Sequence, residues 1–451
     1  MNSSQKSSML SGYFSVSSIL GAKSLWRKLT VTFFILCFYR LSTFIPLPGL
    51  DLRVLQSFLQ STGYKFLGMF EVFSGGALGR ASVMALAMSP YISASIAIQL
   101  LTVIYPDLKK LRKDGPSGRA KLNQYTRYLT LLLVLIQSYT IAVSLEYVVG
   151  SDGASAVFNP GWFFRVCTMV SLTGSTMFLM WLSEQISTHG IGNGSSIIIF
   201  TSIIANLIPS VQNILGMRSS GNISVFEVSV LVSLVITLIV TIVILENVYR
   251  LVPVCYSRTQ AMKISGKMPP SSMPLKVNAS GVLPAIFGEM MSNMPLAAIN
   301  FLITRYFGSI WLISELLESR WFALFLKASL IMMFAVIYST IVLNPEDVAE
   351  ELKASGGYLY DHSPGQKTID YFEKLIPKIS VFGGLYIAIV SILPDIILGN
   401  RGSALYLSGT SLLIIVGVSL EVIAKMQEEV LYSQDDFIVK MQKAKVRRKM
   451  K

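Results

Sequence analysis

Charged side chains are scarce in this chain of 451 residues. Asp, Glu, Lys and Arg together make up 14% of the sequence, whereas hydrophobic residues make up 52%. An average soluble protein carries about 25% charged residues, so this chain lacks the polar surface that several water-soluble domains would need. Low charge with abundant Leu, Ile, Val and Phe also excludes intrinsic disorder. The composition therefore predicts a membrane protein.

Cysteine and histidine are scarce as well, and common enzyme motifs are missing. Cys37, Cys167 and Cys255 share no metal-binding spacing, so we expect three free thiols. His189 and His362 lie in different predicted loops, which argues against a histidine metal site. The motifs G-x-x-x-x-G-K-[ST], H-E-x-x-H and G-x-S-x-G do not occur. We therefore expect no cofactor, no metal and no enzymatic activity.

Ten apolar runs are long enough to cross a membrane, for which a helix needs about 20 residues. They cover approximately residues 29–47, 81–104, 128–149, 162–182, 194–215, 224–245, 279–303, 321–343, 379–398 and 405–424. Residues 1–27 are polar and show no cleavable signal. An even number of spans places both termini on one side of the membrane.

The distribution of basic residues predicts which side that is. With the N-terminus inside, the inside segments hold 28 of the 38 Lys and Arg residues and the outside segments hold 7. Lys and Arg accumulate in cytoplasmic loops, so both termini are predicted to be cytoplasmic. This bias accounts for the net charge of +13 without nucleic acid.

Several runs are poor candidates for helices that face lipid. The first contains Arg40, the fifth opens with the glycine-rich residues 189–194, and prolines interrupt others. Such interruptions are tolerated where the backbone is buried in protein or lines a water-filled space. The bundle is therefore predicted to enclose a space. An apolar stretch at 66–76 is too short to span and is predicted to be half-inserted.

Ionisable residues inside the runs are few, and they bear on one alternative function. We place Glu146, Glu227, Lys327 and Asp395 near run ends, and Arg40, Glu289 and Glu421 deeper. A secondary transporter of small solutes would place facing carboxylates and other polar groups at the membrane midplane. That alternative is supported best by the broken fifth run.

Ten short motifs, taken together, identify a resemblance. They are RLSTFIPLPG (40–49), FSGGAL (73–78), MSPYISAS (88–95), QLLT (99–102), NQYTRYLT (123–130), GIGNG (190–194), PLKVNASG (274–281), PAIF (284–287), NPED (344–347) and SGTSLL (408–413). In order and spacing these motifs resemble the SecY family, the central subunits of the bacterial protein-conducting channel. The resemblance covers residues 28–428.

The resemblance implies an all-α polytopic membrane protein with ten transmembrane helices in two pseudo-symmetric halves and a short plug helix. The implied divisions are a cytosolic N-terminal segment (1–27), an N-terminal half (28–215) with the plug at about 66–76, a C-terminal half (216–428) with cytosolic loops at 249–276 and 344–378, and a basic cytosolic tail (429–451).

The implied function is to pass unfolded polypeptides across the membrane and to release transmembrane segments sideways into lipid. The matching motifs place an apolar pore ring at Met88, Ile92, Ser195, Ile199, Ile286 and Ile414. A narrow apolar waist sheds water and resists ion flow, yet it offers no fixed charge to trap a passing chain. The plug would include Phe66, Met69, Phe70, Phe73, Gly75 and Gly76.

Two further sites follow from the resemblance. Gln99 and Asn278 match polar positions of the lateral gate, where transmembrane segments and signal peptides leave. The inside loops match the docking site for the ribosome and the motor ATPase SecA, with candidate residues Arg250, Arg258, Lys263, Lys267 and Ser363. SecE and SecG are the implied small partner subunits, nascent polypeptides and membrane lipid are further partners, and the bacterial inner membrane is favoured over a plastid membrane.

The chain departs from the family pattern at two places. Ser363 occupies a position where the family usually carries Arg, so the resemblance does not establish how this position would engage the motor. Met88 and Ser195 replace usual isoleucines of the pore ring, so we expect a leakier resting state than an all-isoleucine ring gives.

Overall fold

Long helices make up most of the chain in the computed structural model, which describes residues 23–55, 75–77, 79–148, 154–221, 224–256, 271–302, 319–359, 365–398 and 408–449. The chain divides into two compact units. Unit 1 contains the residues up to Ile208 and those from Val418 onward, and unit 2 contains the residues between them. Two helices, α10 (Gly194–Ser219) and α19 (Gly409–Lys449), contribute residues to both units.

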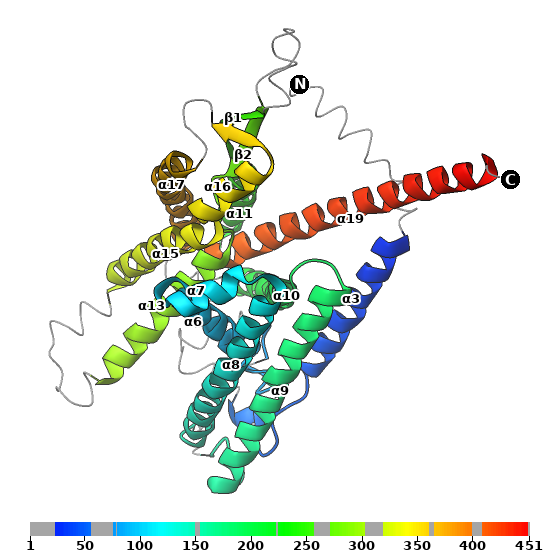
Figure 1. Ribbon diagram of the computed structural model, residues 1–451. Helices are drawn as coiled ribbons and strands as arrows, with labels where there is room; N and C mark the ends of the chain where they lie inside the picture. Colours follow the sequence, from blue (N-terminus) through cyan, green and yellow to red (C-terminus); the bar gives the residue numbers. More distant parts are fainter. Residues whose placement is uncertain are drawn as a thin grey trace. The chain divides into compact units, whose positions relative to one another are not determined.

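Unit 1 consists of helices packed around an aliphatic core. Its other elements are α3 (Lys23–Ser42), α6 (Ser89–Ile104), α7 (Pro106–Lys113), α8 (Gly115–Glu146) and α9 (Trp162–His189) (Figure 1). Helix α8 packs against both α6 and α9. Val134, Phe164 and Leu172 are among the buried side chains of this core.

Helix α6 begins later than the predicted span at 81–104. Residues 81–88 form turns, with Ala81 and Ala87 at φ +45°, and the helix starts at Ser89 with Pro90 in its first turn. Proline suits that position because its missing N–H would be unpaired there anyway. At the other end, Pro106 requires an extended backbone at Tyr105, and α7 leaves α6 at an angle of 103°.

Unit 2 combines long helices with a small sheet. Its helices are α11 (Val225–Glu246), α13 (Leu283–Leu302), α15 (Arg320–Val342), α16 (Pro345–Ala354) and α17 (Gln366–Leu398), joined by parts of α10 and α19. Helix α15 packs against α13 and α17. The first turn of α11 is closed by a capping box, in which Ser224 accepts from the N–H of Glu227 and the Glu227 carboxylate accepts from the N–H of Ser224.

The sheet of unit 2 is antiparallel, with the order β2-β1-β3. It contains β1 (Tyr249–Tyr256), β2 (Ser271–Lys276) and β3 (Gly357–Leu359), and Tyr249 pairs with Lys276 while Val254 pairs with Leu359. Together with α16 and the first turns of α17, these strands form a sheet domain with its own core. That core contains Val252, Val254, Leu275, Val348, Leu352, Leu359, Phe372 and Ile376.

Each of the ten predicted runs overlaps one helix, and the chain is mostly helical, as expected. Seven helices in the described part of the chain are long and apolar enough to span a membrane, and the bent pair α6 and α7 would make an eighth. Helix α3, which carries Lys28 and Arg40, and helix α13, which carries Glu289, do not reach that apolarity. The multi-helix membrane fold is therefore confirmed, while the pseudo-symmetric halves stay a prediction.

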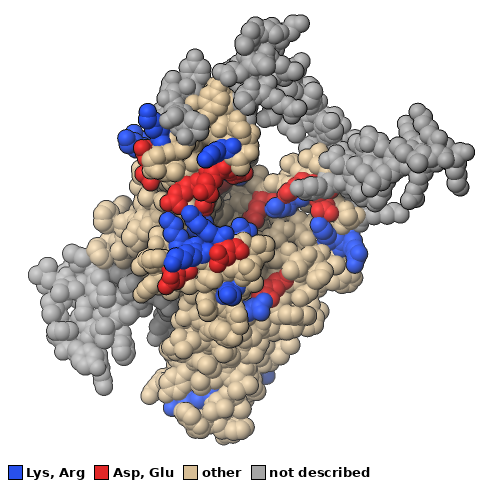
Figure 2. All heavy atoms as spheres, in the orientation of Figure 1, with Lys and Arg blue, Asp and Glu red and all other residues tan. Residues whose placement is uncertain are grey.

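The surface of the spans is apolar. Helix α11 exposes large hydrophobic side chains along its length, among them Val225, Phe226, Ile236 and Ile244. Figure 2 shows Lys and Arg gathered around α7 and the start of α8, whereas the surface along α8 and α9 is mostly free of charge. A broad apolar surface bordered by charge is typical of helices in contact with lipid.

Candidate functional site

Unit 1 holds four residues of the predicted pore ring. Met88 and Ile92 are 2% and 7% exposed, and the N–H of Ile92 donates to the carbonyl of Met88 at 3.0 Å. Ile199 is 4% exposed, and Ser195, one turn earlier on α10, is half-buried. Residues four apart share a helix face. Ser195 and Ile199 therefore share one face of α10, while Met88 immediately precedes α6, which carries Ile92.

Ser195 has a local partner for its hydroxyl group. Its N–H and Oγ both bond to Oδ1 of Asn193, at 3.1 and 2.8 Å, so Asn193 caps the first turn of α10. The start of α10 lies so close to α9 that a Cβ on Gly194 would meet the carbonyl oxygen of Ser183 at 1.9 Å. The glycine-rich break at 190–194 is thus explained by a close contact between two helices.

Unit 2 holds the other two predicted ring residues. Ile286 on α13 is 4% exposed and Ile414 on α19 is 1% exposed. Both are apolar and buried, which is also what ordinary packing would give. The convergence of all six ring residues on one axis stays a prediction.

Only the end of the predicted plug lies within the described residues. Phe66, Met69, Phe70 and Phe73 lie outside them, whereas Gly75 and Gly76 are described, with φ of +67° and +76°. Glycine adopts these left-handed angles without the strain that a side chain would add.

Two arginines fasten this end of the plug segment. The carbonyl oxygen of Gly75 accepts from Nη1 of Arg40 and from Nη2 of Arg80, both at 2.8 Å. The two guanidinium groups lie over the ring of Phe44, at 5.3 and 4.5 Å from its centroid. Cation–π contacts and charged donors both stabilise such an arrangement. The sequence identified Arg40 as a deep charge, but gave no sign that Arg80 and Phe44 join it.

The two predicted gate residues lie in different units and have partners within their own. Nε2 of Gln99 on α6 donates to Oγ of Ser95 at 3.1 Å. Nδ2 of Asn278 donates to Oε1 of the buried Glu246 at 2.6 Å, and Tyr386 of α17 donates to the same oxygen at 3.1 Å. Glu246 thus holds Asn278, a role that sequence reasoning missed. The placement of Gln99 and Asn278 at a lateral gate stays a prediction.

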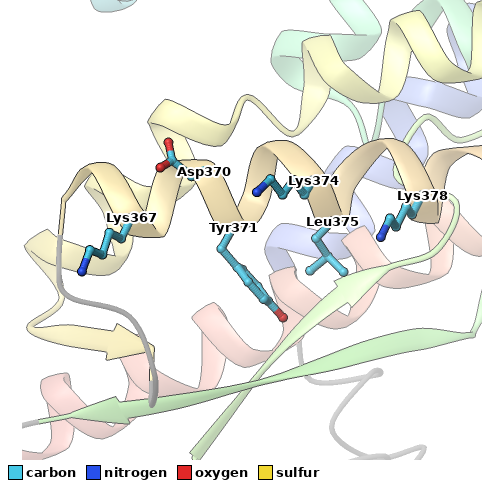
Figure 3. A pocket seen from close by; sticks show the side chains of 6 residues that line it. All are labelled: Lys367, Asp370, Tyr371, Lys374, Leu375 and Lys378. Atoms are coloured by element: carbon cyan, nitrogen blue, oxygen red, sulfur yellow. The ribbon is translucent and has the colours of Figure 1, made fainter.

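The sheet domain carries the described part of the predicted docking surface. Arg250 lies exposed on β1, whereas Arg258, Lys263, Lys267 and Ser363 lie outside the described residues. A cavity of 330 Å³ lies along the start of α17, and it is lined by Lys367, Asp370, Tyr371, Lys374, Leu375 and Lys378. Figure 3 shows Tyr371 and Leu375 directed toward the strands, and both pack on the core of the sheet domain.

The lysines of this cavity were missed as candidates because they fall in a segment predicted as a loop. Lys367, Lys374 and Lys378 are spaced by seven and four residues, which places them along one face of α17. The start of α17 therefore adds a row of positive charge to the sheet domain, which also carries Arg250.

The ionisable residues inside the spans are largely paired. Arg165 of α9 binds Glu146 of α8 at 2.6 Å, and Glu227 caps its own helix. Lys327 lies between Glu289 and Asp395 within unit 2. Pairing removes much of the cost of charge at membrane depth, so these residues do not by themselves indicate a solute pathway.

Comparisons with known proteins agree with this architecture. The family model for SecY matches residues 82–423. The protein translocase subunit SecY of Escherichia coli K12 is 38% identical over 427 residues, which cover 93% of this chain and 95% of that protein. The protein translocase subunit SecY of Rickettsia typhi strain Wilmington is also 38% identical, over 94% of this chain and 98% of that protein.

Two solved structures share the fold. The one described as "The structure of a protein conducting channel" superposes with a TM-score of 0.65, at 14% identity, over 91% of this chain and 93% of that chain. Sec61 in the canine ribosome-channel complex from the endoplasmic reticulum superposes with a TM-score of 0.60, at 15% identity and the same coverage of both chains.

Proposed function

This chain belongs to the SecY family, and from that premise we propose that it forms a channel that passes unfolded polypeptides across the membrane and releases apolar segments sideways into lipid. The observation that carries the proposal is 38% identity to a protein translocase subunit over more than nine-tenths of both chains. The channel-like fold of the solved structures supports it.

The mechanism rests on the apolar pore ring. Met88, Ile92 and Ile199 are buried and apolar, as a waist that excludes water requires. A narrow apolar constriction resists ions because it loses its water, and it offers no charge to hold the varied side chains of a passing polypeptide. The plug residues would close the funnel at rest, and Gln99 and Asn278 would hold the lateral gate. The solute-transporter alternative is not favoured by the comparisons.

We propose the same partners that the family resemblance implies. SecE and SecG would be small membrane subunits, and SecA or the ribosome would dock on the sheet domain and supply energy, since no nucleotide-binding motif of the G-x-x-x-x-G-K-[ST] type occurs. Lys367, Lys374 and Lys378 add positive charge for acidic motor residues or RNA phosphates. The chain would act without enzymatic activity, in a bacterial inner membrane, with both termini cytoplasmic.

Crosslinking to a stalled substrate tests the pore assignment. With Cys37, Cys167 and Cys255 replaced by serine, Ile92→Cys and Ile286→Cys should each crosslink to a secretory chain trapped in transit, because a ring residue must touch the threaded chain. Exposed Val240→Cys, on the outer surface of α11, should not react. An active preparation without adducts at either ring position would defeat the assignment.

The arginine contact at Gly75 predicts a weaker seal in the variant Arg40→Met. Hydrogen bonds from charged groups contribute about 1.5–3 kcal/mol, but Arg80 still holds the carbonyl oxygen, so we expect about a fivefold rise in resting ion conductance in a planar bilayer. The control is Arg53→Met, which removes the same charge at an exposed position of the predicted outside segment that follows the first run. Equal leak in both variants would show that Arg40 does not hold the plug.

A further inference from the structure

A cluster of charged side chains lies in unit 2, with Glu289 and Lys327 buried and Asp395 half-buried, and the proposed pore, plug and gate do not include it. Lys327 of α15 is 8% exposed. Its Nζ lies 2.9 Å from Oδ2 of Asp395 on α17 and 3.6 Å from Oε1 of Glu289 on α13. We call Glu289, Lys327 and Asp395 the charge cluster. Buried ion pairs add little stability compared with apolar packing, so their presence in a span points to a positional role.

Glu289 also reaches a fourth helix. Oγ1 of Thr410 donates to Oε2 of Glu289, and Oγ of Ser408 donates to Oε1 at 3.3 Å. Ser408 immediately precedes α19, and its Oγ accepts from the N–H of Thr410 at 3.3 Å, as a capping residue does. The carboxylate thus lies at the N-terminus of α19, where the helix dipole favours negative charge. Glu289 therefore joins α13 to the first turn of α19.

The helices around the cluster touch at the backbone. A Cβ on Gly288, next to Glu289, would lie 2.3 Å from Cγ1 of Ile331 on α15. A Cβ on Gly409, next to Thr410, would lie 2.2 Å from the carbonyl oxygen of Val390 on α17. Contacts this close show that α13 approaches α15, and α19 approaches α17, at these glycines. The hydrogen bonds of Glu289 are therefore made between closely packed helices.

The proposed ring residues of this unit lie one turn from the same contact. Ile286 precedes Glu289 by three residues on α13, and Ile414 follows Thr410 by four residues on α19. Residues three or four apart share a helix face, and one turn of slippage would displace an isoleucine by about 5.4 Å. The bond between Glu289 and Thr410 is thus placed where it controls the relative height of the two isoleucines.

We propose that Glu289, paired with Lys327 and hydrogen-bonded by Thr410 and Ser408, is a positioning residue that fixes the register of α13 against α19 and so keeps Ile286 and Ile414 at one level of the pore. The inference rests on the proposed channel function. The positive charge of Lys327 on α15 neutralises the Glu289 carboxylate. Asp395 on α17 pairs with Lys327 and holds that lysine in position.

The test compares two variants that each remove one buried hydroxyl group from unit 2. Thr410→Val breaks the bond to Glu289, whereas Ser380→Ala breaks a bond of 2.6 Å to Ser339 that joins α17 to α15. We expect Thr410→Val to raise the resting ion conductance of the reconstituted full-length chain about fivefold, and Ser380→Ala to change it less than about twofold. Both variants should lower the melting temperature by similar amounts.

Conservative variants distinguish a positioning role of the bond between Glu289 and Thr410 from a general loss of protein stability. Thr410→Ser keeps a hydroxyl group and should restore the low conductance, and Glu289→Gln keeps an acceptor and should leak less than Glu289→Leu. Equal leak in Thr410→Val and Ser380→Ala, or no leak in either, would overturn the inference. If Ile286→Ser leaks while Thr410→Val does not, the positioning role alone fails. If Ile286→Ser does not raise the resting conductance either, the assignment of Ile286 to the pore ring is contradicted, and so is the inference that depends on it.

Discussion

The resting channel is expected to conduct ions about tenfold faster when Ile199 is replaced by serine, since a barrier lowered by about 1.4 kcal/mol gives a tenfold change. Ile199 is 4% exposed and belongs to the proposed pore ring. A hydroxyl group at the waist holds water, and water in the constriction lowers the barrier to ions. Conductance in a planar bilayer, measured without a translocating chain, checks the prediction.

A neighbour on the same helix provides the control for Ile199. Ile198 is 1% exposed, and adjacent residues of a helix point about 100° apart, so Ile198 lies on a different face of α10 from Ile199. Ile198→Ser should lower stability by about as much as Ile199→Ser, a few kcal/mol, without raising the conductance. Equal leak would contradict the ring. Ser195→Ile is the converse test, and it should reduce the leak below that of the unchanged chain.

The variant Lys327→Met is expected to lower the free energy of unfolding by about 3 kcal/mol, because it leaves the buried carboxylate of Glu289 and the half-buried carboxylate of Asp395 without their cation. Methionine fills a similar volume, so the loss reports the charge and not a cavity. Unfolding in detergent micelles, followed by tryptophan fluorescence against denaturant, measures the change.

Neutralising the whole cluster should recover most of that loss. The triple variant Lys327→Met, Glu289→Gln, Asp395→Asn buries no unpaired charge, and replacing a buried ion pair by neutral groups is often nearly without cost. The control is Glu184→Gln, which breaks the partly exposed pair with Arg127 at 2.6 Å and should cost less than about 1 kcal/mol. A Lys327→Met variant as stable as Glu184→Gln would contradict the burial of this charge.

The sequence predicted which segments are helical better than it predicted where they end. Hydropathy locates the part of a helix that lies in lipid, so it missed polar turns that continue beyond the membrane. Helix α8 begins at Gly115, not near residue 128, and α17 begins at Gln366, not near residue 379. Helix α19 continues to Lys449, whereas the apolar run ends near residue 424. Helix α6 starts late because Pro90 requires a helix start.

In β1 of the sheet domain, buried and exposed residues alternate. A search for long apolar runs does not detect this pattern. Val252 and Val254 are buried while Leu251 and Pro253 are exposed, which is the period-two alternation of a strand. The strands are short, and their partners come from segments about 20 and 100 residues away along the chain. An alternation over so few residues does not identify such partners, so the two inside loops were predicted without a shared core.

The sequence also could not predict which residues pair with the charged side chains of the candidate site. Arg40 and Glu289 stood out because charge inside an apolar run is costly. Their partners, Gly75 for Arg40 and Lys327 and Thr410 for Glu289, lie 35 to 121 residues away. Composition and spacing say that a partner is needed, but only the folded chain shows which one it is.

Helix α17 connects the sheet domain, the proposed docking site for a motor, to the other end of unit 2. Phe372 and Ile376 anchor one part of the helix in the core of the sheet domain, and Asp395 lies near its other end. Over its 33 residues the helix is about 50 Å long, and it continues through Pro377 and Pro394. If a motor docks on the sheet domain, as proposed, its movement would therefore be transmitted along α17 to the part of unit 2 that contains Asp395, with no loop in between.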